Sequence, residues 1–154
     1  MTVLFMLAGC GAPGGLRPGI SSAGEVRAAM GPPAREWRDG DGSLQWAYPQ
    51  GPMGMKTFMA RFGPDGRLLA LENVLDTEHF ARIQPGVSDQ AFVSRLLGPP
   101  FKVTDFDRRN EQAWDWRYRD VWTARARFTV IFDRATGVVK ERFEFPELRW
   151  EAKE

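Results

Sequence analysis

Two side chains could act as a nucleophile or a proton carrier, because Cys10 and His79 are the only cysteine and histidine among the 154 residues. Covalent or acid–base catalysis needs a second group that activates the first. His79 stands beside Phe80 in a short stretch with helical character, and we expect its side chain to be exposed. These residues therefore predict no catalytic pair.

Carboxylates offer a second kind of chemistry, and four of them surround a predicted turn between two strands: Asp105, Asp107, Glu111 and Asp115. A glycosidase needs two carboxylates at a defined separation, but a solvated loop accounts for this cluster. One cysteine excludes an internal disulfide and a cysteine-rich metal site. The residues around His79 supply too few strong metal ligands. The sequence predicts no enzyme, no cofactor and no metal site.

The residues around Cys10 indicate that it is a site of lipid attachment and not a catalytic nucleophile. Residues 2–8 are apolar, but the run is shorter than the roughly 20 residues that span a bilayer and is typical of a secretory signal. Leu7-Ala8-Gly9-Cys10 resembles the lipobox of bacterial lipoproteins, in which the cysteine thiol receives a diacylglycerol. The resemblance implies a signal peptide over 1–9, acyl chains such as palmitate at Cys10, and a glycine-rich tether over 10–17. A buried N-terminal strand with an inert thiol is the alternative.

Composition places the rest of the chain among globular proteins. The net charge is +1, which does not favour nucleic acid as a partner. Hydrophobic residues make up 43% and charged residues 27%, so the chain can bury a core. Six Trp and eleven Phe occur with 16 Gly and 11 Pro. Many aromatic residues and many turn-formers favour short strands.

An internal repeat is the strongest structural signal in the chain. Three pairs of matching residues lie 67 positions apart: Gly19 and Gly86, Val26 and Val93, and Gly31 and Gly98. Further pairs lie 70 positions apart: Trp46-Ala47-Tyr48 and Trp116-Arg117-Tyr118, Phe58 and Phe128, and Phe62 and Phe132. We interpret this order as a diverged tandem duplication, with units over 18–75 and 76–147 and a tail over 148–154.

Each unit has the same expected elements. A capping box at Ser22 starts a helix, and Ser88 is expected to cap its counterpart; Gly31 and Gly98, each followed by two prolines, end the two helices. Alternating aromatic residues then predict strands over 44–48, 58–62, 114–118 and 128–132. A further short helix is expected over 76–83. The fold class is α+β, with short helices packed on a three- or four-stranded antiparallel sheet in each unit.

The second unit is similar to the SmpA/OmlA (BamE-like) family of small outer-membrane lipoproteins. The residues that carry the resemblance are Ile83, Pro85-Gly86-Val87-Ser88, Val93, Leu96-Leu97-Gly98-Pro99-Pro100, Trp116-Arg117-Tyr118 and Val130-Ile131-Phe132. The family implies a non-catalytic protein anchored in the outer membrane and facing the periplasm. Its implied partners are envelope proteins such as the β-barrel assembly machinery. The same layered unit, also doubled, occurs in β-lactamase inhibitory proteins.

Binding residues are predicted on two surfaces. Strand alternation turns Arg117, Arg119, Arg125 and Arg127 away from the core, with Trp122 at the turn between them, and Arg and Trp are common in interface hot spots. Met53 and Met55 lie in a predicted loop tip that could adapt to an apolar partner. The alternatives are a solubilising face and a plain loop. The expected function is a protein-binding scaffold or assembly factor, or else an inhibitor-type module whose outer sheet face binds an enzyme.

Overall fold

The computed structural model describes residues 13–51 and 53–147, which form an α+β fold with two four-stranded antiparallel sheets. Sheet 1 contains β1 (Arg35–Arg38), β2 (Leu44–Pro49), β3 (Thr57–Phe62) and β4 (Leu68–Asn73). Sheet 2 contains β5 (Lys102–Phe106), β6 (Glu111–Arg119), β7 (Arg125–Asp133) and β8 (Val139–Pro146). In both sheets, strands that are consecutive in the sequence lie side by side.

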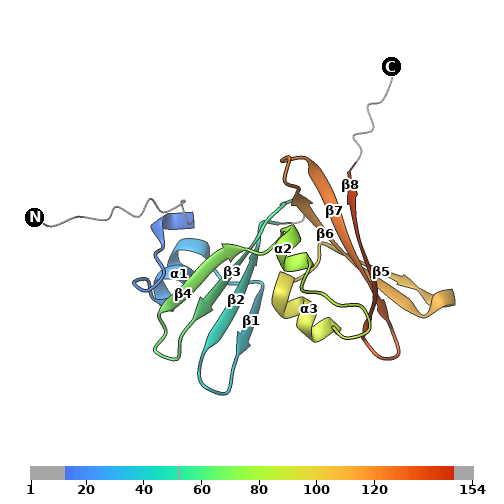
Figure 1. The fold of residues 1–154 in the computed structure, drawn as a ribbon. Coiled ribbons are helices and arrows are strands. Elements are labelled where there is room, and N and C mark those ends of the chain that lie inside the picture. The colour runs from blue at the N-terminus through green and yellow to red at the C-terminus, as the bar shows by residue number, and fades with distance from the viewer. Residues whose placement is uncertain (1–12, 52, 148–154) are drawn as a thin grey trace, which may run out of the picture.

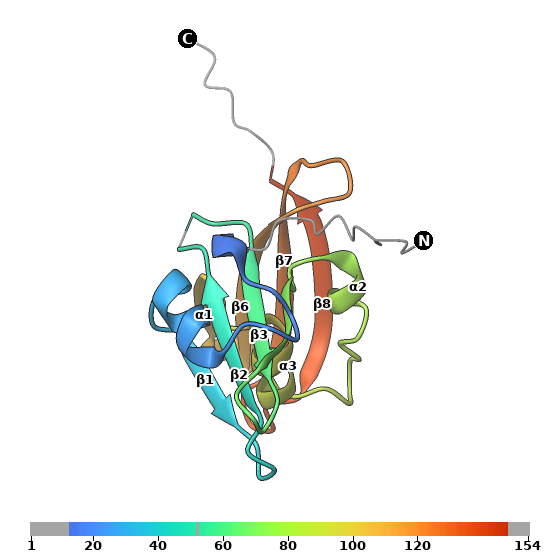
Figure 2. The same ribbon diagram turned by 90° about the vertical axis from the view of Figure 1, so that its left-hand side faces the viewer.

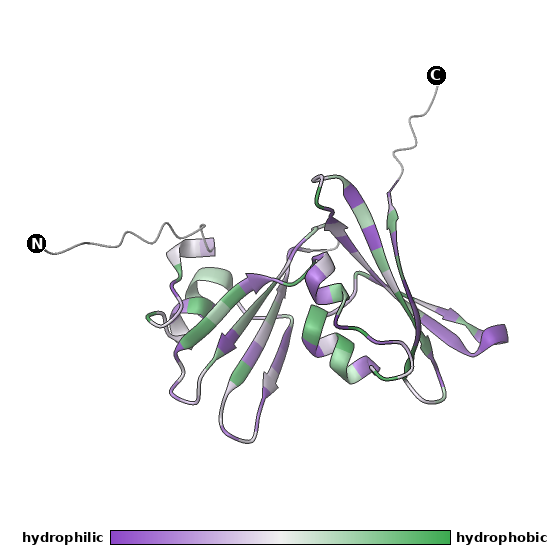
Figure 3. Ribbon diagram, viewed as in Figure 1, coloured by the Kyte–Doolittle hydropathy of each residue, from purple (hydrophilic) through white to green (hydrophobic). Residues whose placement is uncertain are grey.

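The helices separate the sheets into layers (Figure 1). The 3-10 helix η1 (Pro13–Gly15) and α1 (Ala23–Met30) precede sheet 1 in the chain, whereas α2 (Thr77–Phe80) and α3 (Gln90–Leu97) lie between sheet 1 and sheet 2. A second 3-10 helix, η2 (Asp107–Arg109), connects β5 to β6. The hydrophobic turns of α3 occupy the space between the sheets, as Figure 3 shows. The result is a four-layer arrangement of helix, sheet, helix and sheet.

The helix boundaries follow from their capping residues. Ser22 forms the expected capping box with Glu25, whose carboxylate accepts a hydrogen bond from the Ser22 amide. Asp89 caps α3 by accepting a hydrogen bond from the Phe92 amide at 2.8 Å. The prediction of Ser88 as the cap is therefore wrong by one residue. The Ser88 hydroxyl instead accepts from the Gln84 amide at 2.9 Å, which stabilises the turn before the helix.

Both helices end at a glycine, as predicted. Gly31 has φ 80° and Gly98 has φ 74°, a backbone conformation that residues with a Cβ rarely adopt. The segments before the helices also match. The Gly19 amide donates to the Leu68 carbonyl at 2.7 Å, and the Gly86 amide donates to the Val139 carbonyl at 2.8 Å. The two halves thus share the element order and the hydrogen bonds that join each helix to its sheet.

Strand pairing corrects one of the predicted correspondences. Phe58 pairs with Tyr48 in sheet 1, and its counterpart Phe128 pairs with Trp116 in sheet 2. Tyr48 is therefore equivalent to Trp116, and not to Tyr118. The second strand of the repeat has an offset of 68 positions rather than 70. The two additional residues of the second half lie in the β6–β7 hairpin, where chain length is least constrained by packing.

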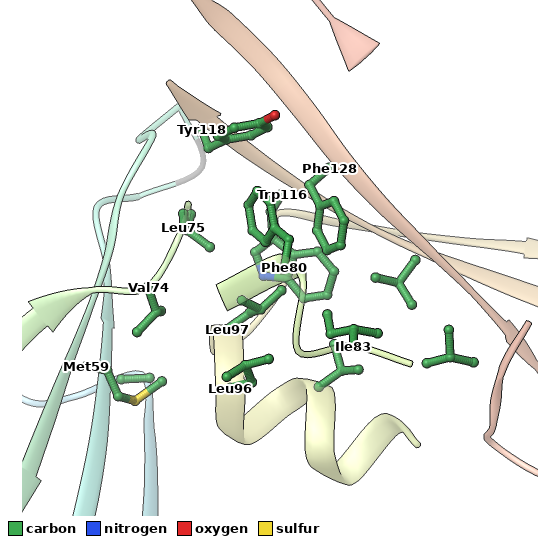
Figure 4. Close-up of a cluster of buried hydrophobic side chains, with 14 of the residues drawn as sticks. Met59, Val74, Leu75, Phe80, Ile83, Leu96, Leu97, Trp116, Tyr118 and Phe128 are labelled. Carbon is green, nitrogen blue, oxygen red and sulfur yellow. The ribbon is translucent and has the colours of Figure 1, made fainter. Parts of the chain in front are cut away.

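The buried side chains form two clusters of different size. The smaller one lies between α1 and the first face of sheet 1 and contains Leu16, Val26, Trp46, Tyr48, Ala60, Phe62 and Leu68. The larger one joins α2, α3 and sheet 2 to the second face of sheet 1, which contributes Ala47 and Met59 (Figure 4). Both faces of sheet 1 are thus buried. The larger core is thus shared between the two halves of the chain.

Two shorter segments also differ from expectation. Leu16 belongs to the smaller cluster and is 7% exposed, so the chain is folded from Pro13 onward and the predicted tether over 10–17 is too long. The helix expected over 76–83 is a single turn, α2, capped by Asp76. The predicted signal peptide, Cys10 and the tail over 148–154 lie outside the described residues.

Candidate binding site

The arginines predicted to share a face do so. Arg117 pairs with Arg127, and Arg119 pairs with Arg125, across β6 and β7. Because side chains alternate along a strand, these residues point away from the side on which Phe128 packs against α2. We call the side toward which the arginines point the outer face of sheet 2. On β8 it includes Phe143 and Phe145, which are 43% and 41% exposed.

Arg117 connects the outer face to the methionine loop. Its Nη1 donates to the Met53 sulfur at 3.4 Å, although the two residues are 64 positions apart. Its Nε donates to Glu147 Oε1 at 2.9 Å, and its guanidinium carbon lies 4.2 Å from the centre of the Phe101 ring. Arg127 Nη2 lies 3.6 Å from the same Glu147 oxygen. Two guanidinium groups thus share one carboxylate.

The β6–β7 hairpin holds its apolar tip in a fixed turn. Trp122 is 84% exposed and Val121 is 77% exposed. Asp120 Oδ1 accepts hydrogen bonds from the Trp122 amide and the Ala124 amide, both at 2.9 Å. Arg119 Nη1 donates to the Thr123 carbonyl at 2.7 Å. These bonds order the backbone of the tip, so little conformational entropy remains to be lost when a partner contacts Trp122.

A pocket of about 300 Å³ lies where the two halves meet. Its walls come from the β2–β3 loop and the start of β3, from Leu75, from the turn after α3 and from β6: Pro49, Gly51, Gly54, Lys56, Thr57, Leu75, Pro99, Pro100, Phe101, Trp116 and Arg117. Two cationic side chains line it, and none of its described lining residues is acidic. Pro99 and Pro100, predicted only to end the helix, therefore also form part of the pocket wall.

The other predicted binding residues are not among the described lining of this pocket, although Met53 contacts the lining residue Arg117. Met55 lies in the β2–β3 loop and is half-buried, whereas Met53 is 70% exposed. Arg125 lies at the outer end of β7 and is exposed. Glu147 was not predicted, because a carboxylate at the end of a strand cannot be distinguished from an ordinary solvated one before the fold is known.

His79 is not the exposed helix residue that was expected. It is 4% exposed, and its Nδ1 lies 2.7 Å from Asp76 Oδ1, which also accepts from the His79 amide. Its Nε2 lies 3.8 Å from Glu72 Oε1. Thr77 and Glu78 form the exposed side of α2, whereas His79 and Phe80 form its buried side. The cap at Asp76 fixes the ring, which gives His79 a structural role.

The carboxylate cluster is also not a simple solvated loop. Asp115 is buried at 6% exposure on the outer face and accepts a hydrogen bond from Thr129. Glu111 binds Lys140 at 2.7 Å, and this contact raises the pKa of the Lys140 ammonium. Asp105 and Asp107 lie near Arg134. These carboxylates bind neighbouring side chains of the same sheet.

The described part of the chain contains neither a metal-binding cluster nor a membrane-spanning helix. Residues 13–51 and 53–147 contain no group of three or more His, Cys, Asp or Glu side chains placed to hold a metal ion. None of the helices in these ranges has the length and hydropathy needed to cross a bilayer.

Comparison with known proteins adds little to this geometry. No family model matches the chain, and no curated protein matches it. One solved structure, a DUF4309 family protein (YjgB) from Bacillus subtilis, is similar at 19% identity and a TM-score of 0.33. The similarity covers 86% of this chain and 82% of that chain. A likeness this weak does not indicate a function.

Proposed function

We propose that this protein is a non-catalytic binding module of the cell envelope, anchored by a lipid on Cys10, that engages a protein partner through the outer face of sheet 2. The uncovered outer face is the observation that supports this most directly. The equivalent face of sheet 1 is buried under α3, with Ala47 and Met59 in the shared core. No helix or further strand within 13–51 or 53–147 packs on the outer face of sheet 2 (Figure 1), although Asp115 and Thr129 on this face are only 6% and 7% exposed.

The chemistry of the outer face fits a protein partner. Phe143 and Phe145 expose apolar surface, and the arginines of β6 and β7 border it. Trp122 extends the apolar surface at the hairpin tip. Aromatic residues and arginines supply most of the binding energy in protein interfaces, and a surface with both is more typical of an interface than of a solubilising face.

The proposed lipid anchor precedes the end of the molecule that also carries the Trp122 hairpin tip. Cys10 lies three residues before Pro13 in the sequence. The end that carries η1 also carries the β2–β3 loop and the β6–β7 hairpin, as Figures 1 and 2 show from two directions. A lipid on Cys10 therefore keeps Trp122 on the membrane-proximal end. This favours a partner in the membrane or at its surface, including the β-barrel assembly machinery of the outer membrane.

Site-specific photocrosslinking in intact cells tests the binding surface. A photoreactive phenylalanine derivative replaces Trp122 or Phe143 on the outer face, and Val87, which is 73% exposed in the turn before α3, serves as the matched control position. We expect one discrete envelope protein to be crosslinked from positions 122 and 143 and not from position 87. Equal labelling from all three positions would reject the outer face as the interface.

The anchor is tested separately by Cys10→Ser. We expect the variant to leave the membrane fraction, because the substitution removes the thiol that carries the diacylglycerol. A variant that stays fully membrane-bound would contradict the lipid anchor while leaving the crosslinking result intact.

In the crosslinking experiment, an adduct with a soluble enzyme whose activity falls on binding would assign the inhibitor-type function in place of the scaffold.

A further inference from the structure

The pocket between the halves has walls of two kinds. Prolines and Phe101 provide rigid apolar surface, and Leu75 and Trp116 lie behind them, 4% and 1% exposed. Rigid walls of this kind lose little entropy when they close on a ligand. The volume of about 300 Å³ is at the small end for ligand pockets. The space therefore suits a small molecule or one terminal residue of a peptide.

The charges at the pocket are unbalanced. Lys56 and Arg117 line it, and Arg127 binds the same Glu147 carboxylate that Arg117 binds. Lys56 Nζ lies 6.0 Å from the centre of the Phe58 ring, and the described lining holds cations without an acidic residue. A low-dielectric wall strengthens the field of such charges. An anion that enters the pocket lies beside cationic groups, and none of the described lining residues is acidic.

The two observations specify one ligand chemistry. We propose that this pocket binds a carboxylate attached to an apolar body, with the apolar part against Phe101 and the prolines and the carboxylate beside Lys56 and Arg117. Arg117 keeps its contacts with Glu147 and Met53 and adds a charge-assisted contact to the ligand. This site shares Arg117 with the outer face, and its small-molecule ligand goes beyond the proposed function. The carboxylate can belong to a peptide C-terminus or to a free carboxylic acid.

Calorimetric titration with N-acetyl-phenylalanine tests the proposal, with N-acetyl-phenylalaninamide as the uncharged control. We expect the acid to bind and the amide to bind at least about tenfold more weakly. Added salt should weaken the binding of the acid. The indole N–H of Trp116, which donates to the Gly98 carbonyl at 3.3 Å, should shift in a nitrogen–proton NMR spectrum. Hexanoate is the second probe: equal affinity indicates a free carboxylic acid as the natural ligand, and weaker affinity indicates a peptide C-terminus.

Variants locate the charge. Lys56→Gln should weaken binding of the acid about tenfold and leave the amide unchanged, whereas Lys140→Gln, a control on the far part of sheet 2, should change neither. Equal binding of acid and amide by the unaltered protein would overturn the proposal without any variant. Undiminished binding by folded Lys56→Gln, or an unshifted Trp116 indole, would also overturn it.

Discussion

Replacing Phe80 with alanine tests whether the single turn α2 holds the two sheets together. Phe80 is fully buried and stacks on Phe128, with ring centres 3.9 Å apart and planes at 6°. It also meets the Tyr118 ring edge-on at 4.8 Å. Truncating a buried Phe costs about 3–5 kcal/mol, and aromatic pairs add about 0.5–1.5 kcal/mol beyond burial. We therefore expect a loss near the top of that range, about 4–5 kcal/mol.

Urea denaturation followed by tryptophan fluorescence and by circular dichroism measures this loss. With a slope of about 2 kcal/mol per molar urea, the midpoint should fall by about 2 M, with both probes changing together because the core is shared. Phe92→Ala is the control, since Phe92 is 44% exposed on α3, and it should cost less than about 1 kcal/mol. A Phe80→Ala loss no larger than that of Phe92→Ala would refute the reasoning.

Three further outcomes are expected. Asp89→Ala should destabilise the protein by about 1 kcal/mol in urea denaturation, because it removes the cap of α3; no loss would contradict the assigned cap. Gly31→Ala and Gly98→Ala should both strain the backbone by about 1–3 kcal/mol. Gly98→Ala should lower the stability to thermal unfolding more than Gly31→Ala does. The added Cβ would lie 3.0 Å from Thr57 Cγ2 at position 98, whereas nothing lies within 4 Å of it at position 31. Equal losses would contradict the close packing of α3 on sheet 1. Hydrogen bonds from Arg95 hold the pKa of Asp39 below its usual 3.8, so this pair stabilises the fold above that pH and the stability is lost as pH falls through the lowered pKa. Asp39→Asn should therefore flatten the acid side of the melting-temperature profile, and an unchanged profile would argue against the pair.

Much of the fold follows from local rules. The glycine–proline stops at Gly31 and Gly98 and the capping box at Ser22 depend only on neighbouring residues, and the structure confirms them. The alternation of Phe128, Val130 and Phe132 also predicts the correct buried face, because all three are fully buried. Such patterns are visible in sequence since each is completed within a few residues.

Other features depend on contacts between distant residues. Ala47 and Met59 lie on the face of sheet 1 that alternation predicts to be the outer one, and they are buried because α3, more than 30 positions later, packs on them. The pocket could not be predicted either, since Lys56 and Arg117 line the same space only when the two halves pack together.

The shared core makes the first half dependent on the second. A fragment that ends at Leu75 would leave the side of its sheet with Met59 open to water, whereas the second half carries both helices that cover its own inner side. As the chain is synthesised, sheet 1 can gain its α1 side early, but its other side stays bare until α3 follows. The N-terminal half is thus the part of the chain most in need of protection from aggregation before synthesis is complete.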